Sequence, residues 1–146
     1  MALTCVVNGM PLLYSGQEAG LNRSLKFFDK DTITWQPHPF SDMYKKLFAF
    51  KHDHQALWNG GWGGQMIRIF NDRQDHVLSF SREKNGDKVV AIFNFDDSPV
   101  KVKLNSKYQA GTYTDLFSGN TFVLKGNDQV SLSAWGYLLL SHGTAK

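Results

Sequence analysis

The sequence predicts a mainly β protein, an antiparallel Greek-key β-sandwich preceded by a loop and one or two helices. Three observations carry this prediction. From about residue 63 onward, apolar residues recur with a period of two, in short runs separated by turn residues. Asn85-Gly86 joins two of these runs and is a strong signal for a two-residue hairpin. Before residue 63 the alternation is missing, and one clear amphipathic helix takes its place.

The alternating runs are expected to form seven or eight short strands. They cover residues 65–70, 77–82, 88–95, 100–104, 111–116, 121–124, 129–132 and 136–141. Ser118-Gly119-Asn120 and Gly126-Asn127-Asp128 supply turns between later strands. Trp135 is expected to pack in the final hairpin. Short strands at this spacing are typical of a sandwich or barrel, and the change of pattern divides the chain into residues 1–62 and residues 63–146.

The first part begins with an apolar run, residues 1–7, that predicts a short helix ending at Asn8-Gly9. Pro11–Tyr14 follows as a brief apolar segment, and its unbroken apolarity predicts a strand buried on both faces. Residues 17–39 are polar, irregular and rich in aromatic residues. Loops of this length are usually functional or disordered, and the aromatic content favours function.

The clearest helix is predicted to begin with Ser41 as its N-cap and to end at Asn59-Gly60-Gly61. It carries an apolar stripe formed by Met43, Leu47, Phe50 and Leu57, widened by Tyr44 and Phe48. This stripe needs a partner surface, which is either the downstream β-domain or the body of a larger protein.

Composition limits the function classes. The chain has 16 Lys and Arg against 13 Asp and Glu, and the basic residues are scattered, which argues against a nucleic-acid partner. No apolar stretch approaches the ~20 residues that a membrane-spanning helix needs. The single cysteine, Cys5, excludes an internal disulfide and is expected to be a buried thiol. The start lacks the basic region of a signal peptide, and the compartment stays open.

The segment Gly9–Glu18, with the sequence GMPLLYSGQE, resembles the last barrel strand of the α-amylase family, glycoside hydrolase family 13. That family carries G-x-P-x-x-Y-x-G-Q/D-E there, after a helix of small and apolar residues. Further segments resemble the following loop, the last barrel helix and the C-terminal β-domain: Lys26–Asp29 with Trp35, Met43–Leu57, Val77–Arg82, Val89–Phe95 and Gly111–Gly119. The resemblance covers nearly the whole chain.

The resemblance implies a fold and a function. Residues 1–62 would be the end of a catalytic (β/α)8 barrel, its last strand, loop and helix, and residues 63–146 would be the C-terminal β-sandwich domain. The parent enzyme would hydrolyse α-1,4-glucans by a retaining mechanism with three carboxylates on earlier barrel strands. None of the carboxylates in this chain matches those positions, so the chain alone is expected to be inactive and to play a structural, stabilising part.

A catalytic pair built from Glu18 with Asp29 or Asp31 is an alternative that we weigh and reject. A retaining glycosidase needs two carboxyl groups ~5–5.5 Å apart and one raised pKa, which a flexible loop cannot supply. Gln17 and Glu18 are expected instead to brace the loop through hydrogen bonds. The spacing of the five histidines gives no metal site, because His52 and His54 point to different sides of a helix.

Four aromatic residues are candidates for sugar contact, since aromatic faces stack on sugar rings. They are Trp58, Trp62, Tyr14 and Trp35. The competing interpretation of Trp58 and Trp62, which the usual burial of large aromatics favours, is that they seal the joint between helix and sandwich. Trp35 has a second interpretation as cover for the end of the barrel.

The expected partners are the missing catalytic barrel and, through the parent enzyme, an α-glucan. We expect no cofactor in this chain, and the resemblance leaves calcium open for the parent. Two rival interpretations are a free-standing starch-binding module, which predicts an exposed aromatic platform, and a purely structural or oligomerising β-domain. Because the apolar N-terminal segment and helix stripe would lack their barrel, self-association of the chain is also expected.

Overall fold

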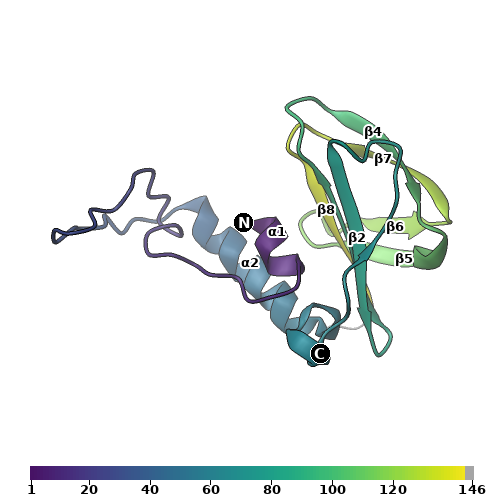
Figure 1. The fold of residues 1–146 in the computed structure, drawn as a ribbon, viewed down its shortest axis with the longest axis horizontal. Coiled ribbons are helices and arrows are strands. Elements are labelled where there is room, and N and C mark those ends of the chain that lie inside the picture. Colours follow the sequence, from purple (N-terminus) through teal and green to yellow (C-terminus); the bar gives the residue numbers. More distant parts are fainter. Residues whose placement is uncertain (144–146) are drawn as a thin grey trace.

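The computed structural model describes residues 1–143. Two α-helices, three short 3-10 helices and eight β-strands make up this range (Figure 1). The helices are α1 (Ala2–Val6), α2 (Pro39–Asp53), η1 (Gln55–Leu57), η2 (Gly60–Trp62) and η3 (Lys107–Gln109). The strands are β1 (Ile67–Arg68), β2 (Val77–Lys84), β3 (Asp87–Asn94), β4 (Val100–Asn105), β5 (Gly111–Asp115), β6 (Thr121–Leu124), β7 (Asn127–Leu132) and β8 (Tyr137–His142). The mainly β prediction is confirmed, and each strand predicted for the sandwich is present.

The strands form two antiparallel sheets. The larger has the order β1-β2-β3-β8-β5-β6, and the smaller pairs β4 with β7. The chain leaves the large sheet after β6, forms β7 in the small sheet and returns as β8 beside β5. This return of a fourth strand to the side of the first is the Greek-key connection.

The Asn85-Gly86 hairpin sets the register of the two longest strands. Both residues have positive φ, 52° and 85°, as a two-residue turn of type I′ requires. The turn pairs Lys84 with Asp87, and the ladder continues to Val77 opposite Asn94. Local turn chemistry therefore fixes which residues of β2 and β3 share a face.

The large sheet is covered on both faces, so the chain has two apolar cores. The inner core lies between the sheets and contains buried side chains such as Ile69, Val90, Val102, Tyr113 and Leu140. The helix-side core lies on the opposite face. It joins Cys5, Val6, Leu47, Phe50 and Leu57 to Phe80, Val89, Ala91, Phe93 and Leu139. The helices and the sheet thus share one continuous core.

Figure 1 shows the consequence for the helices, which stand beside the sandwich while the loop before α2 extends away from both. The apolar stripe of α2 faces the β-domain: Leu47 and Phe50 are buried in the helix-side core. Of the two partners that the sequence left open for this stripe, the β-domain takes part in covering it, together with α1 and η1 in the same core. Cys5 is fully buried, as expected, and burial raises the pKa of its thiol.

The predicted limits of the long helix are wrong at both ends. It begins at Pro39 with His38 as N-cap, whose Nδ1 accepts a hydrogen bond from the Phe40 backbone N–H at 3.2 Å. Proline is favoured at the first helical position, so Ser41 lies inside the helix. The helix ends at Asp53 rather than at Asn59-Gly60-Gly61, and the separate turn η1 follows.

Two further expectations fail. Pro11–Tyr14 belongs to no strand, and Leu12 and Tyr14 are 82% and 60% exposed. A strand needs a hydrogen-bonding neighbour, and none of the described segments pairs with this one. Trp135 is 63% exposed with φ of 54°, so it does not pack in the final hairpin. The turn before β8 needs this left-handed conformation and carries the indole outward.

Candidate functional site

The loop before α2 starts with a tight turn that Gln17 ties to the helix. Its side-chain oxygen accepts hydrogen bonds from the Tyr14 backbone N–H at 2.9 Å and from the Tyr44 hydroxyl at 3.3 Å. Glu18 lies next to it, and its Oε2 is buried with no hydrogen-bond partner among residues 1–143. A buried carboxylate oxygen without a donor costs free energy. A donor from outside the described residues would complete this position.

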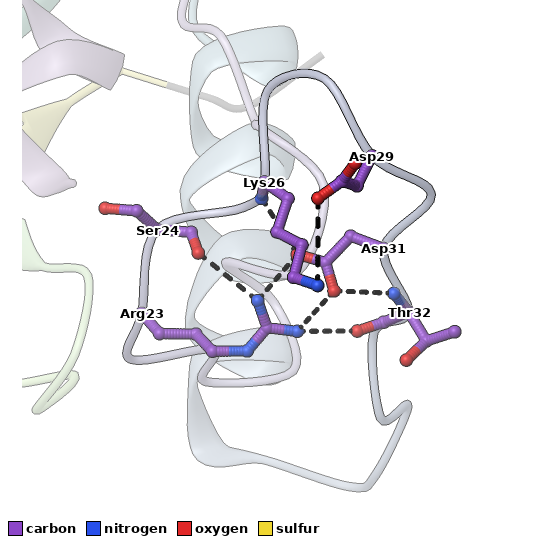
Figure 2. A network of polar contacts seen from close by, with 6 residues as sticks. All are labelled: Arg23, Ser24, Lys26, Asp29, Asp31 and Thr32. Carbon is purple, nitrogen blue, oxygen red and sulfur yellow. Dashed lines mark hydrogen bonds and ion pairs between the residues drawn. The ribbon is translucent and has the colours of Figure 1, made fainter.

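A bidentate ion pair between Arg23 and Asp31 closes the base of the loop (Figure 2). The two nitrogen–oxygen distances are 2.7 and 2.8 Å. Arg23 also donates to the carbonyls of Ser24 and Thr32, and Asp31 accepts from the backbone N–H groups of Lys26 and Thr32. The Arg23 hydrogen bonds, with those backbone donors, hold the pKa of the Asp31 carboxyl well below its usual range. The same pairing raises the pKa of the guanidinium.

Above this base the loop presents two adjacent phenylalanines, Phe27 and Phe28, which we call the aromatic tip. They are 89% and 92% exposed and meet edge to face, with ring centroids 4.8 Å apart. Trp35, on the same loop, is 62% exposed. The aromatic content of this loop was predicted to be functional, but the tip was not among the predicted binding residues. Two consecutive phenylalanines in a polar, irregular segment were the available signal.

The geometry of the loop gives no support to a catalytic pair formed by Glu18 with Asp29 or Asp31. Asp31 is committed to Arg23, and its lowered pKa is opposite to what a general acid needs. Asp29 lies in the exposed part of the loop, where its side chain is 73% exposed and 4.0 Å from the Lys26 ammonium. The loop can therefore position and contact a ligand, but these carboxylates are not arranged to cleave one.

The four aromatic candidates do not gather at one place. Tyr14 and Trp35 belong to the loop before α2, while Trp58 and Trp62 follow the other end of that helix. Trp58 is half-buried, and its indole Nε1 donates to the His52 carbonyl at 2.8 Å. Trp62 is 76% exposed on η2. Trp58 thus lies in the joint between helix and sandwich, whereas Trp62 faces solvent.

Arg82 is the largest side chain that is fully buried, at 1% exposure, and it connects three segments of the chain. Its guanidinium donates five hydrogen bonds of 2.7–3.2 Å to backbone carbonyls. The acceptors are Val6 and Val7 at the end of α1, Leu57 and Trp58 at the end of η1, and Gly64. Burial lowers its pKa, because the charged form loses its hydration.

Arg82 was missed in the sequence analysis, although a signal was present. It occupies the same face of β2 as Leu78 and Phe80, so the alternation places a charge where an apolar residue is expected. Carbonyls at the ends of short helices are acceptors without partners, and a cation is the complementary group. Lys51 adds a second cation at this point, donating to the Leu57 carbonyl at 2.7 Å. Burial and then repulsion from Arg82 lower the pKa of Lys51.

Asp87 attaches the end of α2 to the hairpin of the sheet. One carboxylate oxygen lies 2.7 Å from His54 Nδ1, and the other accepts from the Ala56 backbone N–H at 2.8 Å. The neighbouring His52 pairs with Asp53 instead, at 2.9 Å.

Within residues 1–143, no group of three or more His, Cys, Asp and Glu side chains could hold a metal ion. No helix in that range is long and apolar enough to cross a membrane.

Comparison with curated proteins finds two α-amylases. The chain is 31% identical over 129 residues to α-amylase 2 of Dictyoglomus thermophilum, which is 80% of this chain and 21% of the relative. It is 30% identical over 118 residues to α-amylase MalA of Haloarcula japonica, which is 76% of this chain and 16% of the relative. The chain therefore spans about a fifth of the length of these relatives.

Solved structures show the same fold over almost the whole chain. A noncanonic maltogenic α-amylase from Thermotoga neapolitana matches with a TM-score of 0.79 and 20% identity, covering 96% of this chain and 34% of that one. The γ-CGTase from alkalophilic Bacillus clarkii matches with a TM-score of 0.70 and 20% identity, covering 98% of this chain and 22% of that one. The model of the maltogenic amylase C-terminal domain matches residues 67–139, half of the chain. The chain belongs to the maltogenic amylase C-terminal domain family.

Proposed function

We propose that this chain is the C-terminal part of an enzyme that hydrolyses α-1,4-glucosidic bonds in starch and maltodextrins. Residues 1–62 are the end of its catalytic barrel, and residues 63–146 are its C-terminal domain. The observation that carries the proposal is the shared helix-side core: helices from the first part are packed and hydrogen-bonded onto the sheet of the family domain. Its curated relatives, both α-amylases, support the substrate class.

The first part also has features that are suited to contact with a barrel. The segment Pro11–Tyr14 has no neighbouring strand among the described residues, and a barrel would supply one. Glu18, four positions after this segment, has a buried Oε2 with no hydrogen-bond partner in the described part of the chain. In a barrel of this kind the loops that follow the strands surround the substrate, and we propose on that ground that the braced loop and its aromatic tip lie on the substrate side. We propose Tyr14 and Trp35 as sugar contacts there, and Trp58 and Trp62 as weaker candidates.

The chain alone supports the parent enzyme without cleaving substrate. Its role is to cover the last barrel helix with a stable sandwich, because the stripe of α2 is buried in a core that α1, η1 and the sheet share. We propose no cofactor for this role. Calcium remains a proposal for the parent enzyme only.

Two measurements test the proposal. The purified chain is expected to release no reducing sugar from starch or maltoheptaose, and release above a buffer control would overturn the claim of inactivity. The full reading frame that encodes this chain is expected to include a barrel and to yield a product that cleaves maltoheptaose but not cellohexaose. A reading frame without a barrel would overturn the assignment to an α-glucan hydrolase.

Self-association of the isolated chain is part of the same proposal. Met10 and Leu12 are more than four-fifths exposed, as is the aromatic tip, and exposed apolar surface of this kind favours association. Multi-angle light scattering at rising concentration should show masses above the monomer. A monomer at high concentration would contradict this part of the proposal. Adding a catalytic barrel in trans should reduce the association.

A further inference from the structure

A cleft at one end of the sandwich lies outside the site described above. Its volume is about 410 Å³, within the range of about 300–1,000 Å³ that ligand sites occupy. Three segments line it: the glycine-rich stretch 61–65, the strands β1 and β2, and the short helix η3. Ser81 and Glu83 enter it from β2, on the same face as the buried Val77. The cleft therefore continues the space between the two sheets.

Tyr108 forms one wall of this cleft and is 82% exposed, so the inner core does not need its ring. The helix that carries it is nevertheless firmly held. The buried Tyr113 hydroxyl donates to the Gln109 carbonyl at 2.8 Å, and the Lys88 ammonium donates to the Tyr108 carbonyl at 3.3 Å. Burial raises the pKa of Tyr113 to about 12, so this hydroxyl keeps its proton. A rigid support thus presents an exposed aromatic ring to a cleft.

Apart from Ile67, the remaining lining consists of glycines and polar side chains, with one carboxylate from Glu83 and one ammonium from Lys84. Gln109 is buried, and its amide donates to the Ser81 hydroxyl at 3.1 Å on the floor of the cleft. The Lys88 ammonium is paired with Glu83 Oε2 at 2.8 Å, and the Lys84 ammonium donates to the Gly61 carbonyl at 2.9 Å. Both cations are therefore engaged, which disfavours a phosphate or another anion. Carboxylate and amide groups beside an aromatic ring suit a neutral ligand with many hydroxyl groups.

We propose that this cleft binds a segment of an α-glucan chain, with one sugar ring stacked on Tyr108. A pyranose ring has an apolar C–H face that packs on an aromatic ring, and its hydroxyls donate to oxygens such as those of Glu83 and Gln65. Trp62, which is 76% exposed, lies in the sequence between two of the lining glycines, Gly61 and Gly63. The choice of an α-glucan rests on the proposed function, whereas the cleft and its polarity do not. The site would hold a polymeric substrate away from the catalytic barrel.

Isothermal titration with maltoheptaose tests the site directly on the chain. We expect a dissociation constant on the order of 1 mM for wild type, and weaker binding by at least about fivefold for Tyr108→Ala. The matched control is Trp135→Ala, an aromatic residue that is also exposed, at 63%, and that precedes β8 at the opposite end of this strand from His142. Circular dichroism should show both variants folded, since both side chains are exposed. Unchanged affinity in Tyr108→Ala, or an equal loss in the control, would overturn the proposal.

Nuclear magnetic resonance locates the binding and separates ligand classes. Maltoheptaose should shift the amide signals of Gln65, Ser81 and Gln109, and shifts confined to the aromatic tip would overturn the proposal. Tighter binding of cellohexaose, AMP or inorganic phosphate would also overturn it. If the full enzyme cleaves starch while the cleft binds no maltoheptaose, this inference fails and the proposed function stands. If instead the chain binds maltoheptaose through Tyr108 but the reading frame lacks a barrel, the proposed function fails and the assignment of a ligand to this cleft stands.

Discussion

Replacing Arg82 with methionine should remove the strongest polar connection between the helices and the sheet. Methionine keeps much of the buried apolar volume but loses all five hydrogen bonds to carbonyls. The Leu57 carbonyl keeps its hydrogen bond from Lys51. The other four carbonyls lose the Arg82 donor and keep no side-chain donor in its place. At about 1 kcal/mol for each buried group left without a partner, the free energy of unfolding should fall by about 4 kcal/mol. That is a large part of the 5–15 kcal/mol that is typical of a domain.

Urea unfolding followed by tryptophan fluorescence measures this loss, and a thermal melt should show a fall of about 10–15 °C for a chain of this size. Arg82→Lys keeps the charge but reaches fewer carbonyls, so it should lose about half as much. The matched control is Arg68→Met on the exposed strand β1, which should stay within about 0.5 kcal/mol. A loss below about 1 kcal/mol in Arg82→Met would refute the reasoning. If that variant does not fold, an unchanged Arg82→Lys would refute it instead.

Two further predictions concern the joint and the loop. Gly63→Ala would place a Cβ atom 1.9 Å from the Trp58 carbonyl oxygen, so the free energy of unfolding, measured in urea, should fall by about 1–3 kcal/mol. The control is Gly61→Ala, whose Cβ atom would have nothing within 4 Å and whose stability should not change. Equal stability of the two variants would contradict the packing argument. Arg23→Gln should expose the base of the loop and speed cleavage by chymotrypsin at the aromatic tip, because the bidentate pair is lost. Lys26→Gln is the control; cleavage at the wild-type rate in Arg23→Gln would show that the ion pair does not hold the loop.

The strands of the sandwich were predictable because their signals are local. A period of two specifies which side chains share a face, and Asn85-Gly86 specifies the turn that aligns β2 with β3. The helix α2 was predictable for the same reason, through its stripe. The ends of α2 were harder to predict. At its start, Pro39 occupies the first helical position, so Ser41 is not the N-cap. At its end, the backbone of Ala56 is hydrogen-bonded to Asp87 of the sheet, and the helix stops before Asn59.

The sequence alone also determined the family, through a short motif and the order of the strands. It could not determine what Arg82 does, because the five carbonyls that accept its hydrogen bonds lie 18–76 positions away in the chain. The cleft beside Tyr108 and the unpaired state of Pro11–Tyr14 were also decided by tertiary structure. A local pattern states which face of a segment is apolar. Only the folded chain decides what covers that face and which polar groups are brought together around it.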